Sequence, residues 1–149
     1  MFRRHAVGSA EDEMVYASAQ LSMHSERDGD VHLIALIGDL DIAGAPVFEH
    51  ELKRVENSDA SEIVVDLRGL DFISSDGLKA LIHAESRSRG RHNRLRLVPG
   101  SNQVQRTFET AGLVSRLPFD AGRELRLEMI NRPPHARVVL ALPVRNWRG

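Results

Sequence analysis

The stretch "DFISSDGL" (residues 71–78) places two adjacent serines between an apolar run and a helix-like segment. The preceding run, "SEIVVDL" (61–67), is short and rich in β-branched residues, which favours a strand. The following segment, "SSDGLKALIHAESRSRG" (74–90), has apolar residues at helical spacing and ends at Gly90, a residue suited to a helix C-terminus. The pattern predicts a strand followed directly by a helix that begins at the serines.

Two strands are predicted before this junction. The segment "MVYASAQLSMH" (14–24) alternates loosely, and Asp28-Gly29 after it is typical of a turn. The run "VHLIALIG" (31–38) is apolar on both of its faces, which indicates a strand covered on both sides. A helix should follow from Pro46, because Phe48, Leu52 and Val55 recur at helical spacing.

A strand and a third helix are predicted after the junction. In "NRLRLVPG" (93–100) apolar and basic residues alternate, as in a half-exposed strand. Ser101 can cap the last helix, and Gly112 is suited to its C-terminal end. The helix stripe consists of Val104, Phe108 and Ala111.

The predicted order is strand, strand, helix, strand, helix, strand, helix. Such alternation indicates a single α/β domain with a mixed, mostly parallel sheet of about four to five strands and helices packed on it. We expect residues 1–13 to be a flexible leader, 14–120 to be the domain and 121–149 to be a C-terminal extension of uncertain structure. Within the extension, "ARVVLALPV" (136–144) is interpreted either as an extra strand or as a segment that packs on a partner.

The composition excludes several classes of function. The 149 residues carry a formal net charge of -1, which does not favour nucleic acid or an anionic membrane as a partner. No stretch approaches the length of a membrane span, and the N-terminus lacks the apolar run of a secretory signal. There is no cysteine, so disulfides and thiolate metal sites are excluded. We expect a cytoplasmic globular domain.

Enzyme chemistry finds little support in the sequence. None of the seven histidines has metal-ligand spacing to another ligand, so no metal site and no cofactor are expected. There is neither a G-x-S-x-G nucleophile motif nor a glycine-rich phosphate loop. Carboxylates near the predicted strand ends leave acid–base catalysis open, although turn and capping roles explain them more simply. They are Asp39, Asp41, Asp66 and Asp71.

The two serines at the junction have two interpretations. In the first, a side-chain oxygen caps the helix by accepting a hydrogen bond from a free amide, which is worth about 1 kcal/mol. Capping accounts for one residue of the pair. In the second, one hydroxyl is a phosphorylation target, because helix N-terminal amides accommodate a phosphate without rearrangement of the fold.

Three motifs resemble the STAS domain of bacterial anti-sigma factor antagonists. They are "GDLDIAGAPVFEHEL" (38–52), "EIVVDLRGLDFISSDGLKAL" (62–81) and "VQRTFETAGLVSRLPF" (104–119). The family shows G-E-L-D near the first helix, then V-D-L followed by a segment such as F-I-D-S-S-G-L, and a late helix ending near T-G-L. All three occur here in order, over roughly residues 14–120.

The resemblance implies a site residue by residue. The family serine that follows F-[IM]-D is phosphorylated by the anti-sigma factor acting as a kinase, and Ser75 occupies its position, with Ser74 as the second choice. Ser74 stands where the family often has aspartate, and Asp76 where it often has a second serine or threonine. The residues expected to contact the partner are Asp39, Asp41, Ser74, Asp76, Gly77 and Lys79.

The same resemblance implies a single STAS-type domain that is no enzyme itself. It would bind an anti-sigma factor with serine kinase activity, free a sigma factor for transcription, and be reset by a phosphatase, as a monomer or weak dimer. ATP and magnesium would belong to the kinase. The alternative is a STAS scaffold or transport-associated subunit without a phosphorylation cycle, which the altered neighbours of Ser75 and the extension favour.

Overall fold

The computed structural model describes residues 3–6, 13–17 and 20–119, which form six strands and three helices. In chain order they are β1 (Arg3–Ala6), β2 (Glu13–Ala17), β3 (Leu21–Asp28), β4 (Val31–Leu40), α1 (Ala45–Glu56), β5 (Glu62–Ile73), α2 (Ser75–Ser88), β6 (Arg94–Val98) and α3 (Asn102–Thr110). From β3 onward this is the predicted order. The predicted turn is also present, since Gly29 adopts a φ of 63° between β3 and β4.

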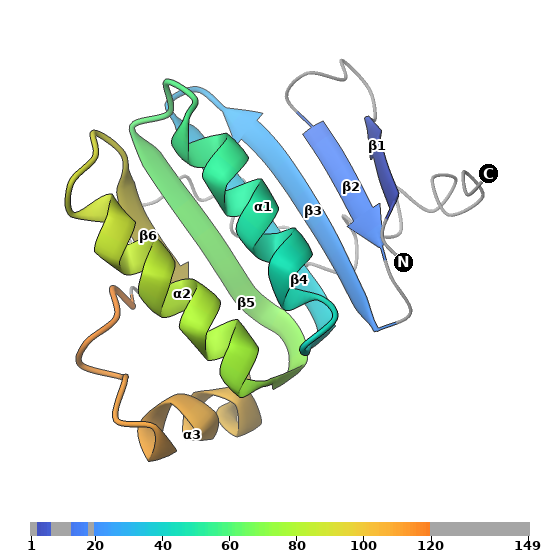
Figure 1. Cartoon of the computed structure of the whole chain (residues 1–149), viewed down its shortest axis with the longest axis vertical. Helices are drawn as coiled ribbons and strands as arrows, with labels where there is room; N and C mark the ends of the chain where they lie inside the picture. Colours follow the sequence, from blue (N-terminus) through green and yellow to red (C-terminus); the bar gives the residue numbers. More distant parts are fainter. Residues whose placement is uncertain (1–2, 7–12, 18–19, 120–149) are drawn as a thin grey trace.

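The strands form one sheet in the order β1-β2-β3-β4-β5-β6 (Figure 1). Antiparallel pairs join β1 to β2, β2 to β3 and β3 to β4, whereas parallel pairs join β4 to β5 and β5 to β6. The predicted α/β class with a mixed sheet is confirmed. The sheet nevertheless has six strands instead of four to five, and most of its pairs are antiparallel, because the segment 14–24 contributes to two strands and β1 adds another.

Strand β1 lies within residues 1–13, the segment that the sequence predicts to be a flexible leader. Arg3–Ala6 pair antiparallel with β2, in a register that runs from Arg3 opposite Ala17 to Ala6 opposite Met14. The sequence of β1 has no apolar periodicity that would predict a strand. Backbone pairing along the edge of β2 defines this strand instead. The rest of the predicted leader up to residue 12, and the predicted extension 121–149, lie outside the described residues.

Helices α1 and α2 lie side by side on one face of the sheet, and α3 lies near the first turn of α2 (Figure 1). Their predicted stripes enter one core, in which Phe48, Leu52 and Phe108 are fully buried. Each such side chain contributes roughly 1.5–3 kcal/mol through removal of apolar area from water. Ala111, expected in the last stripe, is exposed. None of the described helices is long and apolar enough to cross a membrane.

A buried ion pair joins α1 to α2. Nε and Nη2 of Arg87 donate to the two carboxylate oxygens of Glu56 at 2.8 and 3.0 Å, and only 4% of the Glu56 side chain is exposed. This hydrogen-bonded carboxylate raises the pKa of Arg87. A carboxylate that has lost its water stabilises a fold only while its partner is present.

We therefore expect Arg87→Ala to lower the free energy of unfolding by about 2–4 kcal/mol, since it leaves Glu56 buried with only a distant cation. Arg91 Nε lies 3.9 Å from the same carboxylate and compensates poorly. Urea titration followed by circular dichroism measures the change. Arg89→Ala is the matched control, because the Arg89 side chain is 71% exposed and its ion pair among the described residues is with Glu85; this variant should stay within about 0.5 kcal/mol of wild type.

Candidate functional site

The candidate site forms where the parallel strands β4 and β5 end together. Leu40 pairs with Ile73 in the last register position, and the backbone N–H of Ser74 donates to the carbonyl oxygen of Leu40 at 2.9 Å. The loop after β4 and the start of α2 therefore lie next to each other. Loops beyond the carboxyl ends of parallel strands are where α/β proteins commonly bind ligands and partners.

Ser74 is the N-cap of α2. Its backbone is extended, with φ −87° and ψ 172°, and its Oγ accepts a hydrogen bond from the N–H of Gly77 at 3.2 Å. Its carbonyl oxygen accepts the first helical hydrogen bond, from the N–H of Leu78. The capping interpretation is thus confirmed for Ser74, whose hydroxyl is engaged in holding the helix start.

Ser75 is the first residue of α2, and its side chain is exposed. Its hydroxyl has no hydrogen-bond partner among the described residues. The two adjacent serines therefore have different roles, since one closes the helix end and the other presents a free hydroxyl beside it. An exposed hydroxyl at this position is accessible to a visiting enzyme without local unfolding.

The different roles predict different stabilities for two alanine variants. Ser74→Ala should lower the free energy of unfolding by about 1 kcal/mol, because the Gly77 amide loses its acceptor. Ser75→Ala should change it by less than about 0.5 kcal/mol, because no contact is lost. Chemical denaturation of both variants measures the difference, and equal losses would contradict this division of roles.

The remaining predicted residues on α2 differ in exposure. Gly77 is buried, and a Cβ there would lie 2.8 Å from Cγ1 of Ile73 and 2.9 Å from Cγ of Leu40. Its role is therefore to let the first turn of α2 approach the strand ends. Asp76 is half-buried in that turn, where a negative charge is favourable beside the free amides, and Lys79 is exposed.

Asp41 organises the neighbouring loop. Its Oδ1 accepts hydrogen bonds from the N–H groups of Ala43 and Gly44 at 3.1 and 3.0 Å, directly before α1. Asp41 therefore has the turn and capping role that the sequence allows for this aspartate. Asp39, the other predicted contact of the loop, is half-buried and pairs with Phe72 across the parallel ladder.

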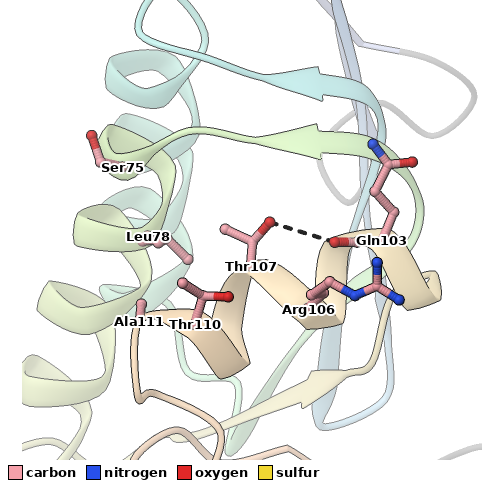
Figure 2. Close-up of a pocket in the computed structure, with 7 residues that line it drawn as sticks. All are labelled: Ser75, Leu78, Gln103, Arg106, Thr107, Thr110 and Ala111. Carbon is pink, nitrogen blue, oxygen red and sulfur yellow. Dashed lines mark hydrogen bonds between the residues drawn. The ribbon is translucent and has the colours of Figure 1, made fainter.

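A groove of about 490 Å³ runs between the start of α2 and α3. Figure 2 shows Ser75 at one end of it and Gln103 and Arg106 toward the other, with Leu78 and Thr107 between them. Its remaining lining residues are Thr110 and Ala111. The groove thus combines an apolar floor with polar groups at its ends, as partner-binding and ligand-binding surfaces do.

Large apolar side chains are exposed near this end of the molecule. Ile42, in the loop after Asp41, is 71% exposed, and Phe72, beside the last residue of β5, is 47% exposed. Sequence reasoning missed both, and it missed the groove residues of α3. Phe72 lies within the motif that carries the family resemblance, but nothing in the sequence indicates that α3 lies beside α2.

The candidate catalytic carboxylates do not converge in this groove, whose lining contains no acidic residue. Asp66 is fully buried and forms a two-pronged ion pair with Arg68, at 2.9 Å from Nε and 2.8 Å from Nη2. The carboxylate raises the pKa of Arg68. Within the described part of the chain, no group of three or more His, Cys, Asp or Glu residues is arranged to hold a metal ion.

A family model described as "Mlab, STAS domain" matches residues 23–118, which include every residue of the site above. The chain belongs to the STAS domain family. The expectation from the three motifs is thereby confirmed. No curated protein shows significant sequence similarity to the chain.

Solved STAS-type structures share the fold. An anti-sigma factor antagonist from Mycobacterium paratuberculosis is 21% identical, with a TM-score of 0.64 over 77% of this chain and 97% of that one. The anti-sigma factor antagonist SpoIIAA in its unphosphorylated form is 17% identical, with a TM-score of 0.60 over 73% and 96% of the two chains. The Bacillus cell fate determinant SpoIIAA in its phosphorylated form is 20% identical, with a TM-score of 0.56 over 74% and 97%.

Proposed function

We propose that this STAS domain is an anti-sigma factor antagonist that binds a kinase-type anti-sigma factor and is switched off by phosphorylation of Ser75. The observation that carries the proposal is the exposed, unengaged hydroxyl of Ser75 at the first position of a 14-residue helix, in register with the family motif. The adjacent cap belongs to Ser74, so a phosphate on Ser75 leaves the interactions that hold the helix intact.

The docking surface combines apolar contact with polar specificity. The exposed side chains of Ile42 and Phe72 supply apolar area, and the groove between α2 and α3, which Ser75 helps to line, supplies a concave surface. Asp39, Asp76 and Lys79 add charged groups around them. Apolar contacts at the centre of an interface with charges near its rim are typical of specific protein–protein interfaces.

Phosphorylation changes this surface locally. The phosphate adds a charge of about −1.5 to −2 at neutral pH. A kinase that transfers it must bring its own ATP and magnesium, and a phosphatase must remove it before the antagonist binds again. The bound partner would have to accommodate the new charge within the interface, where an unpaired charge is costly because it has lost its water. Release of the partner therefore requires no change in the fold.

The experiment starts from the unmodified full-length protein, which is used as bait in lysate of the organism that encodes it. We expect a kinase-type anti-sigma factor to be captured, and ATP with magnesium to release it. Mass spectrometry of the released bait should place one phosphate on Ser75 and none on Ser74. Release with an unmodified bait, or a phosphate on another residue, would contradict the proposed switch.

The second candidate is a STAS interaction subunit without a phosphorylation cycle. It is favoured by the two positions beside Ser75 that depart from the antagonist motif, Ser74 in place of aspartate and Asp76 in place of serine or threonine. Under this candidate, a partner still binds the same surface, but Ser75 stays unmodified with every kinase tested and ATP has no effect on the complex.

A further inference from the structure

A strip of apolar side chains lies on the face of the sheet opposite the helices. It consists of Val31 and Leu33 from β4, Val64 from β5 and Val98 from β6, and no helix residue belongs to it. Along these strands the strip residues alternate with core residues such as Ile34 and Val65, which face the helices. Alternation assigns the two sets to opposite faces of the sheet.

The strip is buried although no described helix covers it. The exposed fractions of its four residues are 7%, 1%, 1% and 4% in chain order. Side chains on a sheet stand roughly perpendicular to it, so neighbours within the sheet cover their flanks and leave their tips open. Near-complete burial therefore requires a second layer over this face.

Charged residues on the same face lead to the same conclusion. Arg96, two residues before Val98 in β6, donates to Glu62 at 2.6 Å, and only 8% of its side chain is exposed. Asp66, two residues after Val64 in β5, is fully buried, while its partner Arg68 keeps 32% of its side chain exposed. Charged side chains normally keep their ends in water, so burial of Arg96 and of the Asp66 carboxylate also indicates a covering segment.

We propose that the cover is the chain's own C-terminal segment, residues 120–149, with the apolar run "ARVVLALPV" (136–144) lying over the strip. The last described residues lie beside β6, at the edge of the sheet from which the following segment can reach the strip. The N–H of Leu97 donates to the carbonyl oxygen of Pro118 at 2.9 Å, and Leu97 forms a parallel bridge with Phe119. The chain thus leaves the domain alongside β6, the strand that contributes Val98.

Length and position exclude the other undescribed segments. Crossing from β6 to β4 spans two strand spacings, about 10 Å, which a few extended residues cover. Residues 1–2, 7–12 and 18–19 are short and adjoin β1 or β2, which β3 separates from β4. The proposal is independent of the switch at Ser75, and it leaves the Ser75 end as the free surface for a partner.

The absence of cysteine from the chain permits a direct test on the full-length protein. A single cysteine at Val98→Cys should react slowly with 5,5′-dithiobis(2-nitrobenzoate), because the cover excludes the reagent. Adding Leu140→Glu should accelerate this reaction at least tenfold. Ala84→Cys, buried on the helix side of the sheet, is the control and should react equally slowly in both backgrounds.

Two results would overturn the proposal. One is a Val98→Cys rate that Leu140→Glu leaves unchanged, and the other is a rate that rises on dilution, which would assign the cover to a second copy of the chain. If Leu140→Glu also exposes Ala84→Cys, the chain has unfolded, and photo-cross-linking decides. A benzoylphenylalanine in place of the exposed Arg94, on the same face of β6, should cross-link to residues 120–149 of its own chain. A cross-link to another chain, or none to this segment, would reject the proposal.

Discussion

A phosphoserine installed at position 75 during translation should weaken binding to the anti-sigma factor by about 30-fold or more. The basis is the cost of placing an unpaired charge within an interface, about 2–5 kcal/mol, where each 1.4 kcal/mol is a tenfold change in Kd. Isothermal titration calorimetry with the partner captured by the unmodified protein measures the change. Because the phosphoserine is incorporated during translation, no kinase is needed. The measurement therefore tests the effect of the phosphate on binding, whichever enzyme would add it.

Two variants define the controls for this result. Ser75→Ala should bind the partner as the unmodified protein does, and ATP with magnesium should no longer release it. Ser74→Ala should still be phosphorylated and released, because its hydroxyl serves the helix cap. Tight binding by the phosphoserine protein would mean that Ser75 lies outside the interface, and the proposed switch would then fail.

Gly38→Ala should cause the largest loss of stability of any variant considered, on the order of 3–5 kcal/mol. Gly38 adopts a φ of 99°, a conformation that residues with a Cβ rarely adopt, and a Cβ there would collide with the backbone oxygen of Gln20. That oxygen also accepts the hydrogen bond from the N–H of Asp39, so the neighbouring strand cannot move aside without losing it. Urea denaturation should show a strongly reduced midpoint, or a chain that no longer folds.

Two other glycines distinguish the stability cost of backbone strain from the cost of a steric clash. Gly112 also has a positive φ, of 73°, but a Cβ there meets nothing within 4 Å, so Gly112→Ala should cost only about 1 kcal/mol. At Gly90 the nearest atom is 3.9 Å away and the φ is not positive, so Gly90→Ala should be close to neutral. If Gly38→Ala and Gly112→Ala lowered the free energy of unfolding equally, the clash with Gln20 would contribute nothing to the loss of stability.

Sequence patterns predicted the features that depend on local periodicity. The helix stripes of α1 and α2, the buried run of β4 and the cap before α2 all follow from spacing that is visible within one segment. The proximity of the loop after β4 to the start of α2 was also within reach, because the ends of parallel strands lie at one edge of a sheet. The resemblance pointed to Ser75 as the target hydroxyl, but only the structure shows that Ser74 is the residue that caps the helix.

Features that depend on tertiary packing could not be predicted from sequence patterns. Glu51 lies on α1 with its side chain fully buried, because Arg54 holds both of its oxygens at 2.8 and 2.7 Å. A charged residue on a helix is expected to be exposed. Only the structure shows the partner that allows it to be buried. The groove also depends on where α3 docks, and β1 depends on the free edge of β2, so neither leaves a periodic signal in the sequence.

The strand order has a consequence for how the chain folds. Among the described residues, every strand after β1 pairs with the strand that precedes it in the chain, so each newly synthesised strand finds its neighbour already made. The hairpin of β3 and β4 closes over a short turn, and α1 and α2 then bring β5 and β6 into parallel pairing one at a time. Because no strand must insert between two others, we expect assembly to proceed from the N-terminal side during translation, with few opportunities for entanglement.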